Sequence, residues 1–536
     1  MVAGIESEVC RVSSEQMTFV LTALRRLTIG LAIGVLAQSV HAGPPGLPAV
    51  VQRMLARAGI AEKNYSVLVI APGASEAEME HAPDVARNPA SAMKLVTTLV
   101  ALDLLGPDFR WHTGVYTLGR VRRGVLEGDL VIQGGNDPAL SIARLGELAK
   151  MIRKRGIREI SGNVLVDRSL YEASLGEQRY FYSERQNPAN APPDSMVVNG
   201  KLVTIGFRPD RTQRRVEVTL TPPLPVLEMA GGVTYVEGAC PPDWKERLLV
   251  EVEGFAESAT LRLAGELAHA CGPRAVSISV LGHFDYFRAA FIDAWRKGGG
   301  QLAGDVQSVE KMPLAARRLD TWISPPLIQV VWEINKTSNN LMARQLFLQL
   351  GVAPAESVSR PEPPSGKNGS TMPAAPDGNA VNEKKAGALA ERAAARVRAW
   401  LAEKELVIPG LVMENGAGLS AMERISARGL VRLLAYAIKQ PYAAGFVDSL
   451  PLAGLDGTMR QRLRDSGVSG HASLKTGTLS EVRALAGYVR RPGERTLLIA
   501  FFINDRNAAA AVPAMDSLVE YLHVHRNEAT GRHRAH

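Results

Sequence analysis

The sequence predicts an α+β protein in which an antiparallel sheet is flanked by helices and interrupted by a long β-rich insert. Three observations carry this prediction. The last third contains three strand-like runs in series joined by short turns, and strands connected in this way pair antiparallel. Apolar helical runs stand on both sides of the middle of the chain, at 89–105 and 327–350. Between them, residues 113–312 hold short β-type runs separated by turn residues.

The elements follow one another in a consistent order. A strand is expected at 65–70, and the apolar helix at 89–105 follows it, ended by a Gly-Pro pair. A span at 352–385 is rich in proline, glycine and serine and predicts a disordered loop. An Ala/Arg-rich helix, the three strands and a closing helix near 509–522 complete the chain.

The length of the chain predicts more than one domain. Its 536 residues exceed what one hydrophobic core usually supports. We predict a discontinuous domain formed by 43–112 and 313–530, with 113–312 inserted as a β-rich region of two subdomains and the loop at 352–385 within the main domain.

The composition narrows the classes of partner. With 46% hydrophobic and 22% charged residues the chain is of the globular type, and its net charge of +8 favours anionic surfaces. No long block of like charges stands out, and aromatic residues are only 5%, so the basic and aromatic stripe that binds single-stranded nucleic acid is missing. We therefore expect no nucleic-acid partner.

The N-terminus has the pattern of an export signal. Two arginines precede an apolar stretch at 27–37, and small residues follow at the cleavage positions up to Ala42. The stretch is too short for a membrane-spanning helix, which needs about 20 residues. We predict a signal-peptide region at 1–42, with Met17 as the more usual start, and an exported protein whose membrane association is at most peripheral. A buried N-terminal helix is the alternative.

Cysteine and histidine placement gives no metal site. Export would remove Cys10 and leave Cys240 and Cys271 in an oxidising compartment, where a disulfide and two buried thiols are both open alternatives. Neither cysteine lies in a Cys-x-x-Cys or Cys/His cluster. His523 and His525 stand in a tail without nearby carboxylate or cysteine, which favours a solvated terminus. We expect no metal and no other cofactor.

The start of the apolar helix places a hydroxyl beside an amine. Asn88 can cap the helix and Pro89 suits its first position, so Ser91 falls in the first turn and Lys94 one turn further on the same face. Unpaired backbone N–H groups and the helix dipole stabilise negative charge at this end. Ser91 is therefore a candidate nucleophile and Lys94 its candidate base.

A lysine base needs a lowered pKa. Free lysine has a pKa of about 10.4 and is mostly protonated at neutral pH. The apolar neighbours of Lys94 supply burial, and a second cation would lower the pKa further. Lys475 is the candidate for that cation, on a strand where Gly477 admits close approach. Ser338 and Asn340 offer a hydroxyl to relay a proton and an amide to hold a substrate carbonyl.

The chain carries its own controls for these short patterns. Another Ser-x-x-Lys occurs at 308–311, where no apolar helix follows, and another Ser-x-Asn occurs at 161–163, in what looks like a turn. Lys-Thr-Gly occurs once. The prediction therefore depends on the order Ser-x-x-Lys, Ser-x-Asn, Lys-Thr-Gly, with each motif in the helix, connector or strand that the chemistry requires.

These motifs resemble those of serine β-lactamases and penicillin-binding proteins. The stretch between the first two is far longer than in a compact β-lactamase, and it is similar to the class C low-molecular-mass penicillin-binding proteins, the D-alanyl-D-alanine carboxypeptidase/endopeptidase family of the penicillin-binding-protein 4 type. The loop at 352–385 departs from that family, and Ala417 stands where a serine is usual. Further similar stretches are GDLVIQGGNDP from Gly128, ENGAGLS from Glu414 and LPLAGLDGTMRQRL from Leu450.

The resemblance implies a penicillin-binding or serine β-lactamase-like fold and an acyl-enzyme mechanism. Ser91 would be the acylated nucleophile and Lys94 its base. Ser338 would pass protons to the leaving D-alanine, and Asn340 would orient the substrate amide. Water would then hydrolyse the acyl-enzyme.

The third motif would bind substrate. Lys475 and Thr476 would hold the terminal carboxylate, Gly477 would allow close approach, and the N–H groups of Ser91 and Thr478 would form the oxyanion hole. The implied substrates are peptidoglycan peptides, with β-lactam antibiotics as inhibitors and a periplasmic location.

Two alternative functions stay open. A serine β-lactamase or esterase of the same fold is disfavoured by the long insert. A non-catalytic cell-wall-binding protein is disfavoured because all three motifs are complete. The sequence does not fix the oligomeric state or the preference between the terminal D-alanine and a cross-bridge.

Overall fold

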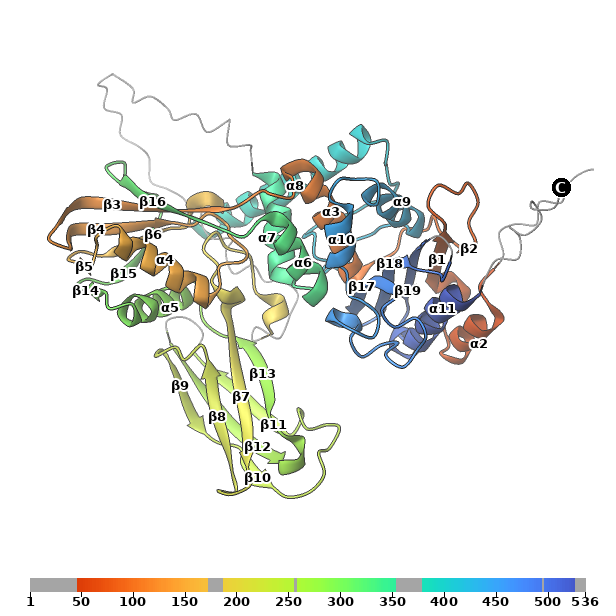
Figure 1. Cartoon of the computed structure of the whole chain (residues 1–536), viewed down its shortest axis with the longest axis horizontal. Helices are drawn as coiled ribbons and strands as arrows, with labels where there is room; N and C mark the ends of the chain where they lie inside the picture. The colour runs from red at the N-terminus through yellow and green to blue at the C-terminus, as the bar shows by residue number, and fades with distance from the viewer. Residues whose placement is uncertain (1–45, 172–186, 255–257, 353–377, 494–495, 526–536) are drawn as a thin grey trace, which may run out of the picture. The chain divides into compact units, whose positions relative to one another are not determined.

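The computed structural model describes residues 46–171, 187–254, 258–352, 378–493 and 496–525 (Figure 1). The predicted signal-peptide region at 1–42 and Cys10 lie outside the described residues. Within the described ranges, no helix has the length and apolar character needed to cross a membrane.

A sheet of five antiparallel strands positions the third motif. Lys475 lies on its edge strand, and the first and last of the strands along the chain pair with each other, with Tyr65 opposite Ile503. Residues from the two ends of the described chain therefore meet in the middle of the sheet. In pairing order the strands are β17 (Ala472–Leu479), β18 (Val482–Val489), β19 (Leu497–Asn504), β1 (Tyr65–Ile70) and β2 (Met79–His81).

Helices cover both faces of this sheet. On β19, Phe501 joins one hydrophobic core and Phe502 the other, so the strand is buried on both sides and its sequence is an unbroken apolar run. One face packs against α2 (Ala49–Arg57) and α11 (Val512–Val524). The other shares a core with α3 (Lys94–Leu105), α6 (Leu327–Thr337), α7 (Asn340–Gly351), α8 (Gly378–Glu403), α9 (Ala427–Ala437) and α10 (Ala443–Ser449).

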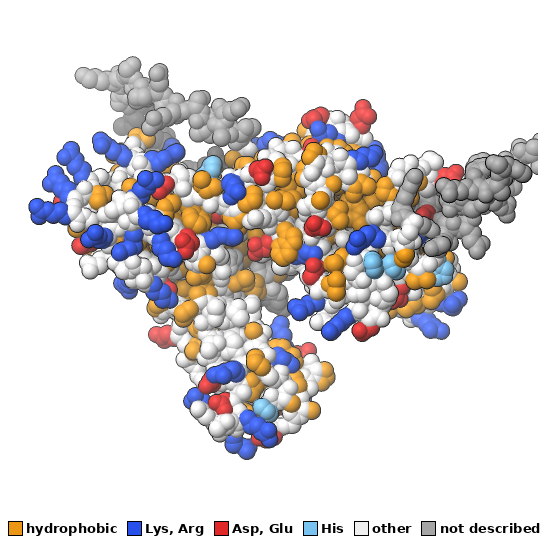
Figure 2. All heavy atoms as spheres, viewed as in Figure 1, with side chains coloured by type: hydrophobic (Ala, Val, Ile, Leu, Met, Phe, Trp, Pro, Cys, Tyr) orange, Lys and Arg blue, Asp and Glu red, His pale blue; other side chains and the backbone are white. Residues whose placement is uncertain are grey.

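A second sheet of seven strands lies between the first two motifs in sequence, with two helices packed on it. These are α4 (Ile142–Lys154) and α5 (His283–Lys297). Figure 2 shows lysine and arginine side chains gathered over one end of this sheet, where Arg120, Arg122 and Arg123 are exposed. Its strands are β3 (His112–Arg122), β4 (Val125–Gln133), β5 (Glu159–Ile160), β6 (Val164–Asp167), β14 (Gln301–Leu302), β15 (Val306–Val309) and β16 (Arg317–Ile323).

Two smaller sheets form the rest of the insert. One holds β7 (Leu202–Asp210), β8 (Arg215–Thr221) and β13 (Arg274–Ser279), and the other holds β9 (Leu227–Gly231), β10 (Thr234–Val236), β11 (Leu248–Glu253) and β12 (Ala259–Ala268). Cys240 and Cys271 form a disulfide here, which decides between the two alternatives that the sequence left open.

Two boundaries differ from the sequence-based expectation. Strand β16 pairs with β3, so the inserted sheet reaches Ile323 rather than ending at residue 312. The prediction of a disordered loop at 352–385 is wrong over its last part, because α8 already begins at Gly378. The alanine-rich sequence after this point favours a helix, and the helix extends back from it into the predicted loop. Residues 353–377 of that loop lie outside the described residues.

Candidate active site

The predicted nucleophile lies in a tight turn that leads into α3. Residues 90–93 form a 3₁₀ turn, and the α-helix begins at Lys94. Ala90, directly before the serine, has a φ of 44°, a conformation that is uncommon for a residue with a Cβ atom. The side chain of Asn88 accepts a hydrogen bond from the N–H of Ala90 (2.8 Å) and donates to the carbonyl of Ser420 (2.9 Å). Asn88 therefore anchors this turn to a distant loop. The sequence had predicted that Asn88 caps the helix, but α3 begins only at Lys94.

The amine of Lys94 is fully buried and has three oxygen neighbours. Its Nζ lies 2.9 Å from Oγ of Ser91, 2.6 Å from Oδ1 of Asn340 and 2.6 Å from the carbonyl oxygen of Ala417. The first and second motifs therefore meet at one atom. The third neighbour comes from the ENGAGLS stretch, so Ala417 contributes its backbone, which does not depend on the side chain at that position.

The surroundings of Lys94 disfavour its charged form. Burial lowers the pKa of Lys94 well below the ordinary value, and the positive charge of Lys475 lowers it further. This agrees with the direction and the source predicted from the sequence. A negative charge on Glu423 acts in the opposite direction and raises the pKa of Lys94.

Glu423 is a site residue that the sequence did not suggest. Burial raises the pKa of its carboxyl to about 7. One carboxyl oxygen accepts the N–H groups of Glu414, Asn415 and Gly416, at 3.3, 3.1 and 3.1 Å, and so it holds the loop that presents the Ala417 carbonyl. No motif marks this glutamate, because its closeness to the lysine arises only when the loop folds back on α3.

Ser338 and Lys475 form a second pair. Nζ of Lys475 donates to Oγ of Ser338 (2.8 Å) and to the carbonyl oxygen of Thr476 (2.8 Å). Burial lowers the pKa of Lys475 to about 7. Ser338 ends α6 in the left-handed conformation, with φ 57°, and α7 begins at Asn340. The helical run predicted at 327–350 is thus broken at the residue that points into the site.

Two glycines let separate segments approach the serine turn. A Cβ atom on Gly477 would lie 2.4 Å from the carbonyl oxygen of Pro89, and one on Gly418 would lie 1.8 Å from that of Ala90. Such distances are shorter than real Cβ contacts, so both positions require glycine. Strand β17 and the ENGAGLS loop therefore pack directly on the turn that carries Ser91.

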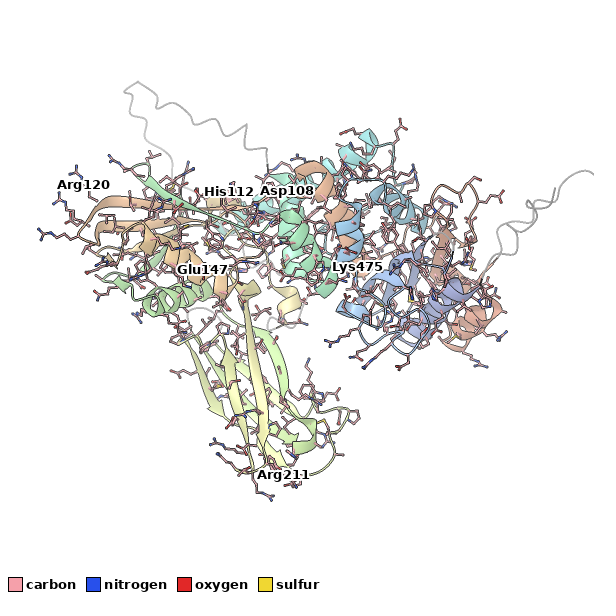
Figure 3. The ribbon with its side chains drawn as sticks, in the orientation of Figure 1. Asp108, His112, Arg120, Glu147, Arg211 and Lys475 are labelled. Atoms are coloured by element: carbon pink, nitrogen blue, oxygen red, sulfur yellow. A yellow bond between two sulfur atoms is a disulfide. The ribbon has the colours of Figure 1, made fainter. Side chains whose placement is uncertain are left out.

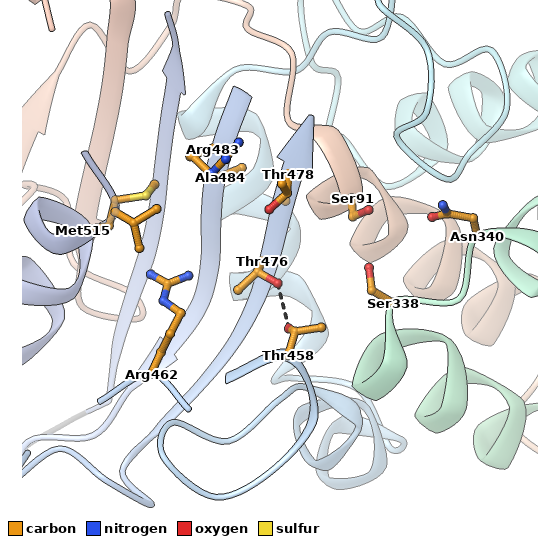
Figure 4. A pocket seen from close by; sticks show the side chains of 12 residues that line it. Ser91, Ser338, Asn340, Thr458, Arg462, Thr476, Thr478, Arg483, Ala484 and Met515 are labelled. Atoms are coloured by element: carbon orange, nitrogen blue, oxygen red, sulfur yellow. Dashed lines mark hydrogen bonds between the residues drawn. The ribbon is translucent and has the colours of Figure 1, made fainter. Parts of the chain in front are cut away.

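These groups open into a pocket of about 410 Å³. Figure 4 shows Ser91, Ser338 and Asn340 on one side of β17, and Arg462 and Met515 on the other. Oγ1 of Thr476 lies 2.7 Å from Oγ1 of Thr458 between the two ends. The lining residues are Ser91, Ser338, Asn340, Thr458, Arg462, Thr476, Gly477, Thr478, Arg483, Ala484, Val512 and Met515.

The remaining sequence candidates lie elsewhere. Ser161 hydrogen-bonds backbone groups of the seven-stranded sheet, and Ser308 lies in β15 of the same sheet. Lys336, close in sequence to the second motif, donates to the Leu450 carbonyl and to Asp456, both at 2.6 Å. By contrast, Lys475 of the third motif belongs to the site and lies on the edge strand of the five-stranded sheet (Figure 3).

The histidines near the C-terminus do not form a metal site in the described part of the chain. His523 is buried and lies 2.5 Å from the Arg490 carbonyl oxygen, so the predicted solvated tail is wrong at this position. Its burial results from its place on α11, which packs on the sheet. Among the described residues, no group of three or more His, Cys, Asp or Glu side chains could hold a metal ion.

Known proteins are similar to this chain in sequence and in architecture. A carboxypeptidase named DacB from Haemophilus influenzae is 21% identical over 415 residues, which cover 77% of this chain and 79% of the relative. A D-alanyl-D-alanine carboxypeptidase from Actinomadura sp. (strain R39) is 28% identical over 466 residues, covering 81% and 76%. The crystal structure of penicillin binding protein 4 from H. influenzae matches with a TM-score of 0.68 and 20% identity over 89% of this chain and 99% of that chain, so the two share a fold.

The family model covers both sides of the site. The model for the D-Ala-D-Ala carboxypeptidase 3 (S13) family matches residues 47–362 and 378–524, a range that includes all three motifs. The fold is the antiparallel sheet with flanking helices that the sequence predicted. The chain belongs to the D-Ala-D-Ala carboxypeptidase 3 (S13) family of serine peptidases.

Proposed function

We propose that the pocket at Ser91 is the active site of this D-Ala-D-Ala carboxypeptidase and that it cleaves peptidoglycan peptides through an acyl-enzyme on Ser91. The arrangement around Lys94 carries the proposal, because its Nζ lies 2.9 Å from the serine Oγ and burial lowers its pKa. Peptidoglycan stem peptides and cross-bridges offer the D-alanyl bond that the family hydrolyses.

The hydrogen bonds around Lys94 suit a neutral amine. A neutral amine has two N–H donors and one lone pair, whereas an ammonium group has three donors and no lone pair. The oxygens of Asn340 and Ala417 can only accept, so they use both N–H groups. The lone pair is then left for the O–H of Ser91, which is the direction of proton transfer that activates a serine.

Acylation follows from this arrangement. Oγ of Ser91 attacks the carbonyl carbon of the scissile bond while Lys94 takes its proton. The N–H groups of Ser91 and Thr478 stabilise the negative charge that develops on the carbonyl oxygen. The leaving amine then receives a proton through Ser338, which is oriented by Lys475. Water attacks the acyl-enzyme in a second step and releases the shortened peptide.

The third motif holds the substrate in this scheme. Lys475 and Thr476 bind the carboxylate next to the leaving nitrogen, and Asn340 orients the substrate amide. β-Lactams would acylate the same serine, and a structure of the H. influenzae relative complexed with a β-lactam supports this part of the proposal. Benzylpenicillin and peptides would thus compete for one site.

Covalent labelling tests the assignment of the nucleophile. Ser91→Ala is expected to abolish stoichiometric labelling by fluorescent penicillin and the release of D-alanine from a pentapeptide. Ser308→Ala, in the other Ser-x-x-Lys sequence on β15, is the matched control and should retain both. Stoichiometric labelling of the Ser91 variant would reject the assignment.

Export is the remaining part of the proposed function. The pattern at 1–42 supports a cleavable signal peptide and a periplasmic location, where peptidoglycan is accessible. N-terminal sequencing of the protein recovered from the periplasm should begin near Gly43. A full-length protein that stays in the cytoplasm would contradict the export proposal.

A further inference from the structure

The pocket continues around the edge strand β17 to the opposite face of the sheet. Successive side chains of a strand point to opposite faces. Lys475 and Gly477 therefore share the face that packs on the serine turn, whereas Thr476 and Thr478 share the other face. Arg483 on β18 is directly opposite Thr478 in the register, so its side chain lies on the face of the two threonines.

Two guanidinium groups stand at that far end. Arg462 and Arg483 both line the pocket, together with Val512 and Met515 of α11. We call Arg462 and Arg483 the arginine end. Burial lowers the pKa of Arg483, and the positive charge of Arg462, which lines the same pocket, lowers it further.

The arginine end carries an uncompensated positive charge. Arg462 is paired with Asp516, at 2.6 Å. Arg483 donates to the carbonyl oxygens of Leu479 and Val482, at 2.6 and 2.8 Å, and in the described part of the chain it has no ion pair with a carboxylate. Two cations and one anion therefore leave a net charge of one at this end of the pocket. An anion bound there would relieve the repulsion between the guanidinium groups.

We propose that the arginine end binds a second carboxylate, one carried by the leaving group of an extended substrate. This inference rests on the function proposed above. In that scheme the first carboxylate lies at Lys475 and Thr476, and the arginine end lies beyond Thr476 as seen from Ser91 (Figure 4). A single departing D-alanine has one carboxylate, which the first position uses. A departing peptide with further carboxylates has another to place, so the enzyme favours cross-bridges over terminal D-alanine.

Arginine suits this role because its planar guanidinium binds carboxylates in a fixed geometry. The backbone contacts of Arg483 hold one end of its side chain, which limits the entropy lost on binding. The group also lies on a strand of the central sheet rather than on a loop, so its position relative to Thr478 is fixed by the register.

Three substrates with the same acyl part test the proposal. The first is a monomeric pentapeptide that releases D-alanine, and the second is a cross-linked dimer with free carboxylates on the leaving peptide. The third is the same dimer in which the carboxylate next to the scissile nitrogen stays free and the other carboxylates of the leaving peptide are amidated. The purified full-length mature protein should cleave the free-acid dimer with a higher kcat/KM than the amidated dimer. Raising the salt concentration should reduce this difference, since salt screens the attraction.

Arg483→Gln is the main variant. We expect it to lower kcat/KM for the free-acid dimer about tenfold, the size of one hydrogen bond to a charged group, and to change the other two substrates less than twofold. Arg483→Lys should restore part of the preference. Arg490→Gln removes the same charge from an exposed arginine that also bonds a backbone carbonyl, and it should leave all three rates unchanged.

The outcomes are distinguishable. An equal loss of kcat/KM for all three substrates in Arg483→Gln, with normal penicillin labelling, would overturn the second carboxylate position. A wild-type protein that cleaves the two dimers with the same kcat/KM would overturn it as well. A wild-type protein that takes penicillin but cleaves none of the three substrates would instead reject the proposed function.

Discussion

Replacing Lys94 by methionine tests directly whether it is the proton acceptor, as proposed. Methionine is flexible and apolar, so it suits the fully buried site while removing the base. A positioned general base contributes about 10²–10⁴-fold to a rate, equivalent to about 3–5 kcal/mol of the barrier. We therefore expect Lys94→Met to slow acylation by benzylpenicillin at least about a hundredfold.

The same substitution has a structural cost that can be estimated separately. The oxygens of Asn340 and Ala417 lose a donor, and each buried group left unsatisfied costs about 1–3 kcal/mol. Removing an amine whose charged form is already disfavoured offsets part of this loss. Thermal unfolding should therefore show a destabilised but folded protein, so the loss of acylation is not a loss of fold.

Stopped-flow acylation across pH gives the decisive result. The acylation rate of the wild type should fall as pH falls through the pKa of Lys94, because the protonated amine has no lone pair. The acylation rate of the variant should not show this fall at acid pH. Lys336→Met is the control, since Lys336 is also buried and bonded to a carbonyl but is not among the residues that line the pocket. Acylation of Lys94→Met within tenfold of wild type would refute the base role.

Three further predictions concern the support of the site. Glu423→Gln removes a charge that raises the pKa of Lys94, the proposed base, so the fall in acylation rate at acid pH should move to lower pH. Replacing Cys240 and Cys271 by serine removes a disulfide between residues 31 positions apart. This should lower the free energy of unfolding of the inserted region by about 3–4 kcal/mol in denaturant melts, with acylation retained. Gly477→Ala brings a Cβ atom to 2.4 Å from a carbonyl oxygen of the serine turn and should abolish penicillin labelling, whereas Gly467→Ala, with open space around it, should not.

Each of these three predictions would be contradicted by a specific outcome. A fall in acylation rate that stays in place or moves to higher pH in Glu423→Gln would show that the carboxyl does not act on the lysine. Loss of acylation in the variant with serine at both positions would show that the inserted region and the site are coupled. Normal labelling of Gly477→Ala would show that β17 can move away from the serine turn.

The strands and the motif residues were predictable because their signals are local. The apolar run of β19 predicts a strand buried on both faces, and helical spacing places Ser91 beside Lys94. The direction of the lysine pKa also followed, since burial and a second cation act in the same sense. These conclusions need only chain spacing and side-chain type.

Other features depend on tertiary packing and left no local trace. Ser338 breaks the helical run through a left-handed backbone, without the glycine or proline that usually announces such a break. Glu423 and Arg483 reach the site only through loop closure and strand register. His523 is buried because α11 packs on the sheet, although the tail that follows this helix is polar and basic.

The pairing of β1 with β19 affects when the enzyme becomes active during its production. Tyr65 and Ile503 are neighbours in the sheet, so β19 must be synthesised before β1 has its partner. Contacts between such distant positions form late in folding. A chain interrupted during synthesis therefore has Ser91 but no completed site, and activity begins only after nearly the whole polypeptide has been made.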